Sequence, residues 1–376
     1  MFLKLDTGVI GQFDTVLEDQ VETVHTGTLA VLKGIAKYRS ISTAIQALGC
    51  AVLGDKTRYR AMIAGNLTRK RIRLPGLFGN PVVSGIYGWV KLVQAALLHR
   101  YLRLRLAQDP PIVIIFNGSN FPESVLADVS HDLPRVFVEG GFFPATLQID
   151  PNGLNGANSV PRDPQFYLDP SRDFAANGLP QAVNNRPSKS SFAPVTLPTD
   201  YVFVPFQVPS DMQVTLHSPW IRDMAQFYDA ILAAAQRNPD QTFVIKEHPS
   251  FKRSVIGTRP DHPRVIFANG NTTSDLIRDA RAVITLNSTV GIEALLIGTP
   301  VITLGHACYN IDGLVQHAET PAALDATLRA NWQPDPELAR QFIGYLWNDY
   351  LVHGRYDDLP DDLGQQIAAK VKSLTK

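Results

Sequence analysis

The sequence predicts a two-domain α/β protein built on parallel sheets. Its 376 residues favour two domains over one. Hydrophobic residues make up 45% and charged residues 19%, which is the balance of a globular chain with a sizeable core. Strand-like and helix-like segments alternate between residues 201 and 305, as in a doubly wound parallel sheet.

Charge and cysteine content exclude several classes of protein. Lys and Arg number 35, as do Asp and Glu, which argues against a nucleic-acid-binding protein. Cys50 and Cys308 give no disulfide framework and suit a reducing cytoplasm. The first residues lack an apolar signal segment, and no run of about 18 apolar residues occurs. We therefore expect a cytoplasmic protein without a membrane-spanning helix.

The first hundred residues are expected to be mainly helical. Residues 1–60 follow a helical period, with one short strand expected at 51–53. Two basic stretches follow, at residues 69–73 and 99–105, the second within a helix expected around 89–107. These stretches either touch an anionic membrane surface or acidic acceptor, or form the solvated faces of core helices. The second interpretation is preferred.

Two buried strands are expected next. The apolar runs at 112–116 and 135–138 predict them, and Glu139 directly follows the second run. A segment rich in Asn, Gly and Pro at 142–167 predicts a loop, in which Asp150 forms a turn.

A linker separates the two expected domains. Residues 168–200 are rich in Pro, Ser and Asn and show little periodicity. We therefore assign residues 1–195 to a first domain with its linker, 196–335 to a second domain, and 336–376 to helices that pack back across both.

The second domain opens with two strands that end in polar residues. An apolar run at 201–208 predicts the first strand, and Asp211 lies just beyond it. A helix is expected at 221–237, and a strand at 243–245 then ends in Lys246. Open parallel sheets bind ligands at the carboxyl ends of their strands, so these residues become candidates for a binding site.

A strand–turn–helix unit completes the expected site. The apolar run at 283–286 ends before Ser288 and Thr289, and a helix is expected at 290–297. Free N–H groups and hydroxyls at a helix start can bind an anion, and Lys246 and His248 could add positive charge. We therefore predict a phosphate site here.

The residue types favour a donor with one phosphate and no metal. The sequence has no D-x-D triplet, P-loop, G-x-S-x-G elbow or cluster with metal-ligand spacing. Lys246, His248 and a helix N-terminus already supply counter-charge for a phosphate leaving group. Glu139 and Asp211, each beyond a strand end, could divide the acid–base and nucleophilic roles of sugar transfer.

At this point the sequence resembles a known family. The segments VEGGFFPATLQIDPNGLNGANSVPRDPQFY, FQVPSDMQVT, KEHP and LNSTVGIEALLIGTPVITLG resemble the bacterial capsule-polysaccharide β-Kdo transferases. These are retaining enzymes of GT-B architecture that use CMP-Kdo. The resemblance covers residues 111–315 and implies two Rossmann-like domains whose parallel sheets face an interdomain cleft. The first would be the acceptor-side domain and the second the nucleotide-binding domain.

The resemblance also implies roles for the carboxylates. Asp211 matches the nucleophile that would form a covalent Kdo adduct, and Glu139 matches the acid/base of the family's E-x-G motif. Gln207 would line the Kdo pocket. Asp150 and Asn155 lie in the family's signature loop without an assigned role.

The remaining matches concern the nucleotide. Lys246 and His248 match the residues that neutralise the CMP phosphate, and Ser288 and Thr289 match the phosphate-binding helix start. Glu293 would lie near the ribose. The expected partners are CMP-Kdo and a glycan or glycolipid acceptor of capsule or O-antigen synthesis. No cofactor and no metal are expected.

Two alternatives remain open. A sugar-nucleotide 2-epimerase of similar architecture would also place carboxylates and a His in its cleft, but it would use a UDP-sugar. A non-catalytic nucleotide- or glycan-binding module would bind ligand without chemistry. The expected location is the cytoplasm, with peripheral contact at the inner membrane as an open extension.

Overall fold

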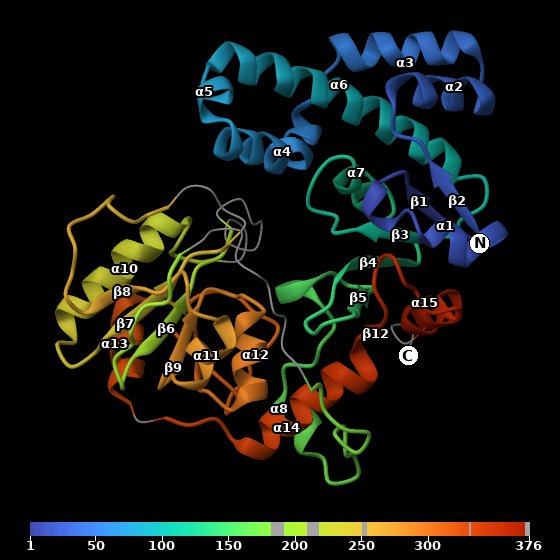
Figure 1. The fold of residues 1–376 in the computed structure, drawn as a ribbon. Helices are drawn as coiled ribbons and strands as arrows, with labels where there is room; N and C mark the ends of the chain where they lie inside the picture. The colour runs from blue at the N-terminus through green and yellow to red at the C-terminus, as the bar shows by residue number, and fades with distance from the viewer. Residues whose placement is uncertain (182–191, 209–217, 250–253, 331, 373–376) are drawn as a thin grey trace. The chain divides into compact units, whose positions relative to one another are not determined.

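The computed structural model describes residues 1–181, 192–208, 218–249, 254–330 and 332–372. The chain forms two compact units (Figure 1). Unit 1 comprises residues 1–141, 145–154 and 352–376, and unit 2 comprises residues 142–144 and 155–351.

Unit 1 is built on a six-stranded mixed sheet. Its strands are β1 (Phe2–Leu5), β2 (Val21–Val24), β3 (Ile112–Phe116), β4 (Arg135–Gly140), β5 (Thr146–Asp150) and β12 (Val352–His353). The order across the sheet is β12-β5-β4-β3-β1-β2. Strands β1 to β4 are parallel, whereas β5 pairs antiparallel with both β4 and β12. The parallel part has the order of a flavodoxin-like sheet.

Helices cover both faces of this sheet. They are α1 (Phe13–Leu17), α2 (Thr28–Tyr38), α3 (Ile41–Leu53), α4 (Arg60–Arg73), α5 (Pro75–Phe78), α6 (Pro81–Leu106), α7 (Glu123–Val129) and α15 (Leu363–Lys372), with 3-10 turns η1 (Gly8–Ile10), η2 (Glu18–Gln20) and η3 (Thr57–Tyr59). Leu3 and Ile115 pack toward α2, α3, α6 and α7, while Phe2 and Ile114 pack toward α1 and α15. This alternation is that of strands buried on both faces.

Unit 2 contains a fully parallel six-stranded sheet. Its strands are β6 (Val202–Pro205), β7 (Phe243–Lys246), β8 (Val265–Phe267), β9 (Ala282–Thr285), β10 (Val301–Thr303) and β11 (Gln316–His317). The order is β11-β10-β9-β6-β7-β8, so the chain starts in the middle and reverses direction between β6 and β9. This is the strand order of the Rossmann fold, and the β6–β9 junction is its topological switch point.

The unit 2 sheet also lies between two helical layers (Figure 1). The helices and turns are η4 (Asn155–Ala157), α8 (Pro164–Leu168), α10 (Met224–Arg237), α11 (Thr273–Arg278), α12 (Val290–Ile297), α13 (Pro321–Arg329), α14 (Pro336–Tyr345) and the π-helical turn η5 (Leu346–Tyr350). Phe203 and Val244 join the cluster that includes α11, α12 and α14, whereas Val202 and Ile245 join the cluster with α10 and α13.

Most predicted elements of the second half are confirmed. The expected strands at 201–208, 243–245 and 283–286 correspond to β6, β7 and β9, and the helix at 290–297 is α12. In the first half, β3, β4 and α6 contain the expected strands and helix. By length and composition alone, α6 could also cross a membrane, a property that the search for an apolar run missed.

Two expectations for the first 60 residues are wrong. Residues 51–53 form the last turn of α3, which ends at Gly54, and Ala51 is buried on the helix face that packs inward. The helical period hid β1 and β2, which are only four residues long each. Because every residue of β1 is buried, including Lys4, the strand shows no polar–apolar alternation.

The predicted loop at 142–167 is partly regular structure. It contains β5 and most of α8, because backbone pairing with β4 stabilises a strand in spite of the turn residues around it. The turn role of Asp150 is confirmed. Its Oδ1 accepts hydrogen bonds from Asn152 N at 2.8 Å and Gly153 N at 3.2 Å.

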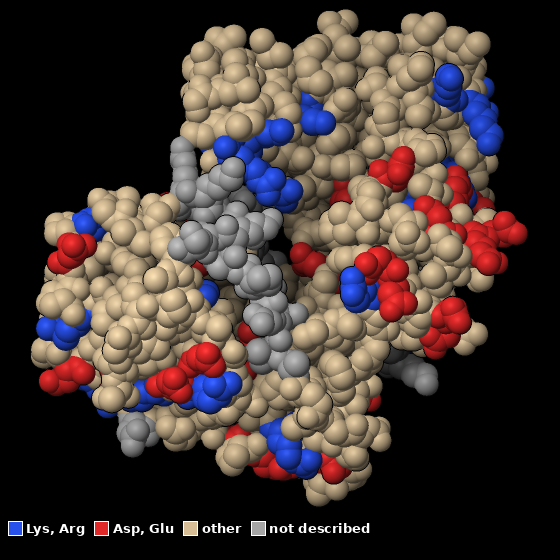
Figure 2. Space-filling model, viewed as in Figure 1, with Lys and Arg blue, Asp and Glu red and all other residues tan. Residues whose placement is uncertain are grey.

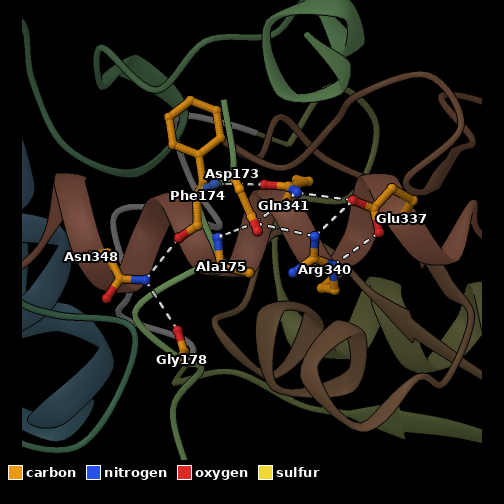
Figure 3. Close-up of polar contacts among 8 residues, drawn as sticks. All are labelled: Asp173, Phe174, Ala175, Gly178, Glu337, Arg340, Gln341 and Asn348. Carbon is orange, nitrogen blue, oxygen red and sulfur yellow. Dashed lines mark hydrogen bonds and ion pairs between the residues drawn. The ribbon is translucent and has the colours of Figure 1, made fainter. Parts of the chain in front are cut away.

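Residues 155–181 pack with unit 2, so the structural boundary differs from the one predicted near residue 195. Gln341 accepts a hydrogen bond from Phe174 N at 2.7 Å, and Asn348 donates one to Phe174 O at 2.8 Å. Figure 3 shows these contacts, which join the segment to α14 and the turn after it. The linker composition concealed a segment that is stabilised by contacts far away in the sequence.

The final segment divides between the two units. Helix α14 and turn η5 belong to unit 2, whereas β12 and α15 belong to unit 1. Gly344 permits the close approach of α14 to the 174–175 backbone, because a Cβ there would lie 2.7 Å from Ala175 N.

Candidate functional site

A pocket opens beside the switch point of the unit 2 sheet. It is bounded by the ends of β6 and β7 and the start of α12. Its lining residues are Phe203, Pro205, Phe206, Lys246, Glu247, His248, Pro249, Thr273, Val290 and Glu293. The structure therefore brings together three predicted site residues, Lys246, His248 and Glu293. This is the position at which Rossmann-like sheets bind ligands.

Lys246 ends β7 and is half-buried. Its Nζ donates hydrogen bonds to the carbonyl oxygens of Asn269, at 3.4 Å, and Asn271. Burial lowers the pKa of Lys246, since the charged ammonium loses hydration. An ammonium has three N–H donors, so two carbonyl contacts fix its position and leave donor capacity for a ligand.

Glu247 and Asn269 fix the loop that carries His248, and the sequence analysis missed both. Glu247 N donates to Asn269 Oδ1 at 2.8 Å, and Asn269 Nδ2 donates to Glu247 Oε2 at 3.0 Å. Glu247 Oε1 also accepts from Val255 N at 2.7 Å. This reciprocal pair joins the loop after β7 to the loop after β8, and the Asn-Gly turn at 269–270 was its only sequence signal.

Tyr309 holds the start of α12 in place through a hydrogen bond. The buried Tyr309 hydroxyl donates to Ser288 O at 2.5 Å, and burial raises its pKa well above the ordinary value. Ser288 Oγ accepts from Val290 N at 3.2 Å, while Thr289 makes no capping hydrogen bond through its side chain. Gly291 allows the contact, because a Cβ there would lie 2.5 Å from the Tyr309 hydroxyl. Ser288 thus acts as a capping residue at the predicted helix start.

Glu293 lies on the first turn of α12 and is only 2% exposed. This burial excludes a solvated position for Glu293 on the surface of the helix. Its carboxylate lines the pocket near a helix N-terminus, where the helix dipole favours negative charge.

Gln207 closes the switch point itself. Its Nε2 donates to Asn287 Oδ1 at 3.0 Å, which joins the chain after β6 to the chain after β9. Both side chains are buried. The structure therefore gives Gln207 a positioning role, beside the pocket rather than in its lining.

Glu139 lies at the carboxyl end of β4 in unit 1. Asn117 Nδ2 donates to Glu139 Oε1 at 3.0 Å, from a left-handed backbone position with φ 61° after β3. Tyr356 lies close by, and its pKa is raised by burial and by the negative charge of Glu139. Glu139 is partly exposed, so a proton could pass between its carboxylate and a ligand.

Glu123 is a further carboxyl group that the sequence analysis missed. It accepts from Thr7 Oγ1 at 3.0 Å and from Phe116 N at 3.2 Å, which places it at the junction of β1 and β3, the switch point of the unit 1 sheet. Burial raises its pKa to about 8. Nothing in its sequence context, FPESVL, distinguishes it from a surface residue at a helix start.

Asp211, the predicted nucleophile, lies outside the described residues. Asn155 has a left-handed backbone with φ 54° at the start of η4, and its functional role stays unassigned. Among the described residues, one group could hold a metal ion: the ligand atoms of His306, His317 and Glu319 lie within 4.8 Å of one another. His317 Nε2 already pairs with Glu319 Oε1 at 3.0 Å, and the group lies outside the pocket lining.

The chain is similar to several known proteins. The family described as capsule polysaccharide biosynthesis protein matches residues 195–356. Protein FixF of Sinorhizobium fredii is 57% identical over 370 residues, covering 97% of this chain and 92% of its own. The capsule polysaccharide export protein KpsS of Escherichia coli is 26% identical over 287 residues, covering 58% of this chain and 72% of its own. A solved structure, the β-Kdo 2,7 transferase KpsC of Thermosulfurimonas dismutans, gives a TM-score of 0.43 at 18% identity, over 72% of this chain and 88% of its own.

The described chain thus consists of two Rossmann-like α/β units with parallel-rich sheets, one of which has a pocket at its switch point. The chain belongs to the same family as protein FixF, its relative over nearly the whole length, and residues 195–356 match the capsule polysaccharide biosynthesis protein model.

Proposed function

We propose that this protein is a retaining β-Kdo glycosyltransferase. It transfers Kdo from CMP-β-Kdo to a bacterial surface glycan or glycolipid, acts in the cytoplasm and needs no metal. The observation that carries the proposal is the pocket at the β6–β9 switch point, which gathers Lys246, His248 and the start of α12 around one cavity. The match of residues 195–356 to the capsule polysaccharide biosynthesis protein family supports a surface glycan as the product.

The pocket suits a nucleoside monophosphate leaving group. Lys246 and His248 provide side-chain donors, and the N-terminus of α12 adds a favourable dipole. CMP carries one phosphate, so these groups can neutralise the charge that develops when it leaves. Glu293 is positioned to accept hydrogen bonds from ribose hydroxyl groups.

The transfer is a double displacement. The Asp211 carboxylate attacks the anomeric carbon of Kdo, and the bond from that carbon to the phosphate oxygen breaks, which releases CMP. The acceptor hydroxyl then gives its proton to Glu139 and attacks the same carbon, which frees the Asp211 carboxylate. Two inversions at one centre retain the configuration.

Mass spectrometry of the protein tests the mechanism directly. We expect wild-type protein incubated with CMP-Kdo and an acceptor panel to release CMP and form product. The Glu139→Gln variant should accumulate a Kdo adduct on Asp211, and Asp211→Ala should form neither adduct nor product while still binding CMP. Full turnover by Asp211→Ala would refute the mechanism.

Nucleotide binding separates the alternatives. Calorimetry with CMP and UDP should show a preference for CMP. A preference for UDP, with epimerisation of a UDP-sugar, would instead identify a 2-epimerase. If the protein binds CMP but releases no CMP from CMP-Kdo with any acceptor, it is a non-catalytic module. Full activity after dialysis against a chelator is expected, and its loss with recovery on Zn²⁺ would assign the His306 group a role.

A further inference from the structure

The helices between β2 and β3 form a strongly basic part of unit 1. From Thr23 to Gln108 the sequence holds fourteen Lys and Arg residues and a single acid, Asp55. The whole chain is neutral, so the remainder carries the balancing negative charge. On the face drawn in Figure 2, the region over α4 to α6 shows blue side chains within a broad tan surface.

The structure distinguishes the two basic stretches within this region. In the stretch 99–105, Arg105 is buried and pairs with Glu22 at 2.5 Å, and His99 is buried beside Asp128 at 3.3 Å. That stretch is therefore partly core structure. In the stretch 69–73, Arg71 and Arg73 are exposed on the last turn of α4.

Large apolar side chains are exposed next to Arg73. On α6, Val82 is 66%, Ile86 62% and Trp89 48% exposed. The spacings of four and three residues place them on one face of the helix. Leu74 and Leu77, around α5, are about half-exposed as well. These five residues form what we call the apolar edge.

The apolar edge and the cations are held side by side. Lys70 Nζ on α4 lies 5.8 Å from the ring centroid of Phe78 on α5. The Phe78 ring in turn packs edge-on against Tyr87 of α6, with centroids 5.2 Å apart. Asn80 caps α6 by accepting hydrogen bonds from Val82 N and Val83 N, which orients the first turns of the helix. The end of α4, α5 and the start of α6 thus present one surface.

We propose that this surface docks on an anionic phospholipid membrane. Aliphatic side chains and a Trp would enter the boundary between headgroups and acyl chains, while Lys70, Arg71 and Arg73 contact lipid phosphates. Nucleic acids and acidic glycans can pair with the cations but offer no apolar phase to Val82 and Ile86.

Docking in the plane of the interface fits the structure better than spanning the membrane. The second half of α6 packs in the unit 1 core through residues such as Leu97, Leu98 and Leu102, which are buried. Insertion of the whole helix would expose this core, whereas docking uses only the exposed first turns. The proposal does not depend on the identity of the sugar that the protein transfers.

Vesicle flotation tests the proposal with the full chain. We expect the protein to float with vesicles containing 30% phosphatidylglycerol in phosphatidylcholine and to bind pure phosphatidylcholine about tenfold more weakly or worse. The double variant V82E/I86E should lose at least about tenfold in binding. The variant R71E/R73E should lose a similar factor, and raised salt should weaken the wild-type binding.

Control variants on unit 2 carry the same types of substitution, each with half the charge change of the corresponding test variant. Ile256→Glu and Arg222→Glu alter exposed residues and should leave flotation unchanged. Circular dichroism should show that all variants are folded. Equal flotation by V82E/I86E and wild type would overturn the proposal. The proposal would also be overturned if the protein bound heparin beads more tightly than vesicles and V82E/I86E left heparin binding unchanged. The surface would then bind an anionic polymer.

Discussion

Different chemical groups join the strand ends at the switch points of the two sheets. In unit 2 a neutral amide pair, Gln207 and Asn287, joins the two strand ends and leaves an open pocket with Lys246 beside it. In unit 1 a buried carboxyl group, Glu123, joins the corresponding strand ends through Thr7 and the backbone of Phe116.

The difference indicates a division of labour between the units. The neutral pair of Gln207 and Asn287 adds no charge that would repel a phosphate, so the edge of the unit 2 sheet is suited to hold an anion. The edge of the unit 1 sheet carries the buried Glu123 and the partly exposed Glu139, and a partly exposed carboxylate suits proton transfer. Architecture alone would have suggested two similar nucleotide sites.

The largest expected effect concerns proton transfer in unit 1. Glu139→Gln keeps the hydrogen bond to Asn117 but cannot accept a proton. We expect the rate of sugar transfer to fall by about 10² to 10⁴, with CMP affinity unchanged by calorimetry. Loss of CMP affinity would show instead that unit 1 takes part in nucleotide binding, which would break the division of labour.

The next effect concerns the cation of unit 2. Lys246→Ala removes the ammonium that Asn269 and Asn271 position, and we expect CMP affinity to fall by about 10- to 100-fold, since a hydrogen bond to a charged group is worth about 1.5–3 kcal/mol. Cytidine, which lacks the phosphate, serves as the control ligand and should lose little affinity. An equal loss for cytidine would remove Lys246 from the phosphate site.

A smaller effect is expected on the stability of the helix start in unit 2. The Cβ of Gly291→Ala would meet the Tyr309 hydroxyl at 2.5 Å. Overpacking of this kind costs about 1–3 kcal/mol, so the thermal midpoint and CMP affinity should both fall. Gly85→Ala on α6, where a Cβ meets nothing within 4 Å, is the control. Equal stability of the two variants would show that α12 can shift freely.

An effect of a different kind, on stability rather than on activity, is a pH dependence in unit 1. The pKa of Glu123 is about 8 in the fold against 4.5 for an ordinary Glu, so the folded state favours the protonated form. Its stabilising contribution is complete below pH 4.5 and is lost as the pH rises toward 8, by on the order of 5 kcal/mol. Glu123→Gln should remove this part of the decline in the free energy of unfolding, measured in urea at pH 5 and pH 8. Glu18→Gln, at an exposed position, should not.

Local sequence patterns predicted unit 2 well, because its strands are continuous apolar runs that end abruptly in polar residues. Lys246 and His248 were found from such an end, Glu293 was implied by the family resemblance, and the three residues share one pocket. The patterns failed where structure depends on distant partners. β5 forms by pairing with β4, and the 155–181 segment is stabilised by α14.

The contacts that orient the site were equally hidden. Tyr309 reaches Ser288 across 21 residues, and Glu123 meets Thr7 across 116. The residue types at these positions do not indicate such distant partners. A single sequence therefore indicates which side chains end a strand. The residues that hold those side chains in place are found only from the contacts in the three-dimensional structure.

Strand β12 and helix α15 have a consequence for the order of folding. They complete unit 1, yet they follow all of unit 2 in the chain. During synthesis, unit 2 can emerge and fold while the sheet of unit 1 still lacks its edge strand, which leaves β5 unpaired on that side. Contacts between such distant segments form slowly because a long loop must close first. A nascent chain stalled before residue 352 should therefore expose β5 to chaperones, and release of the last segment should end that exposure.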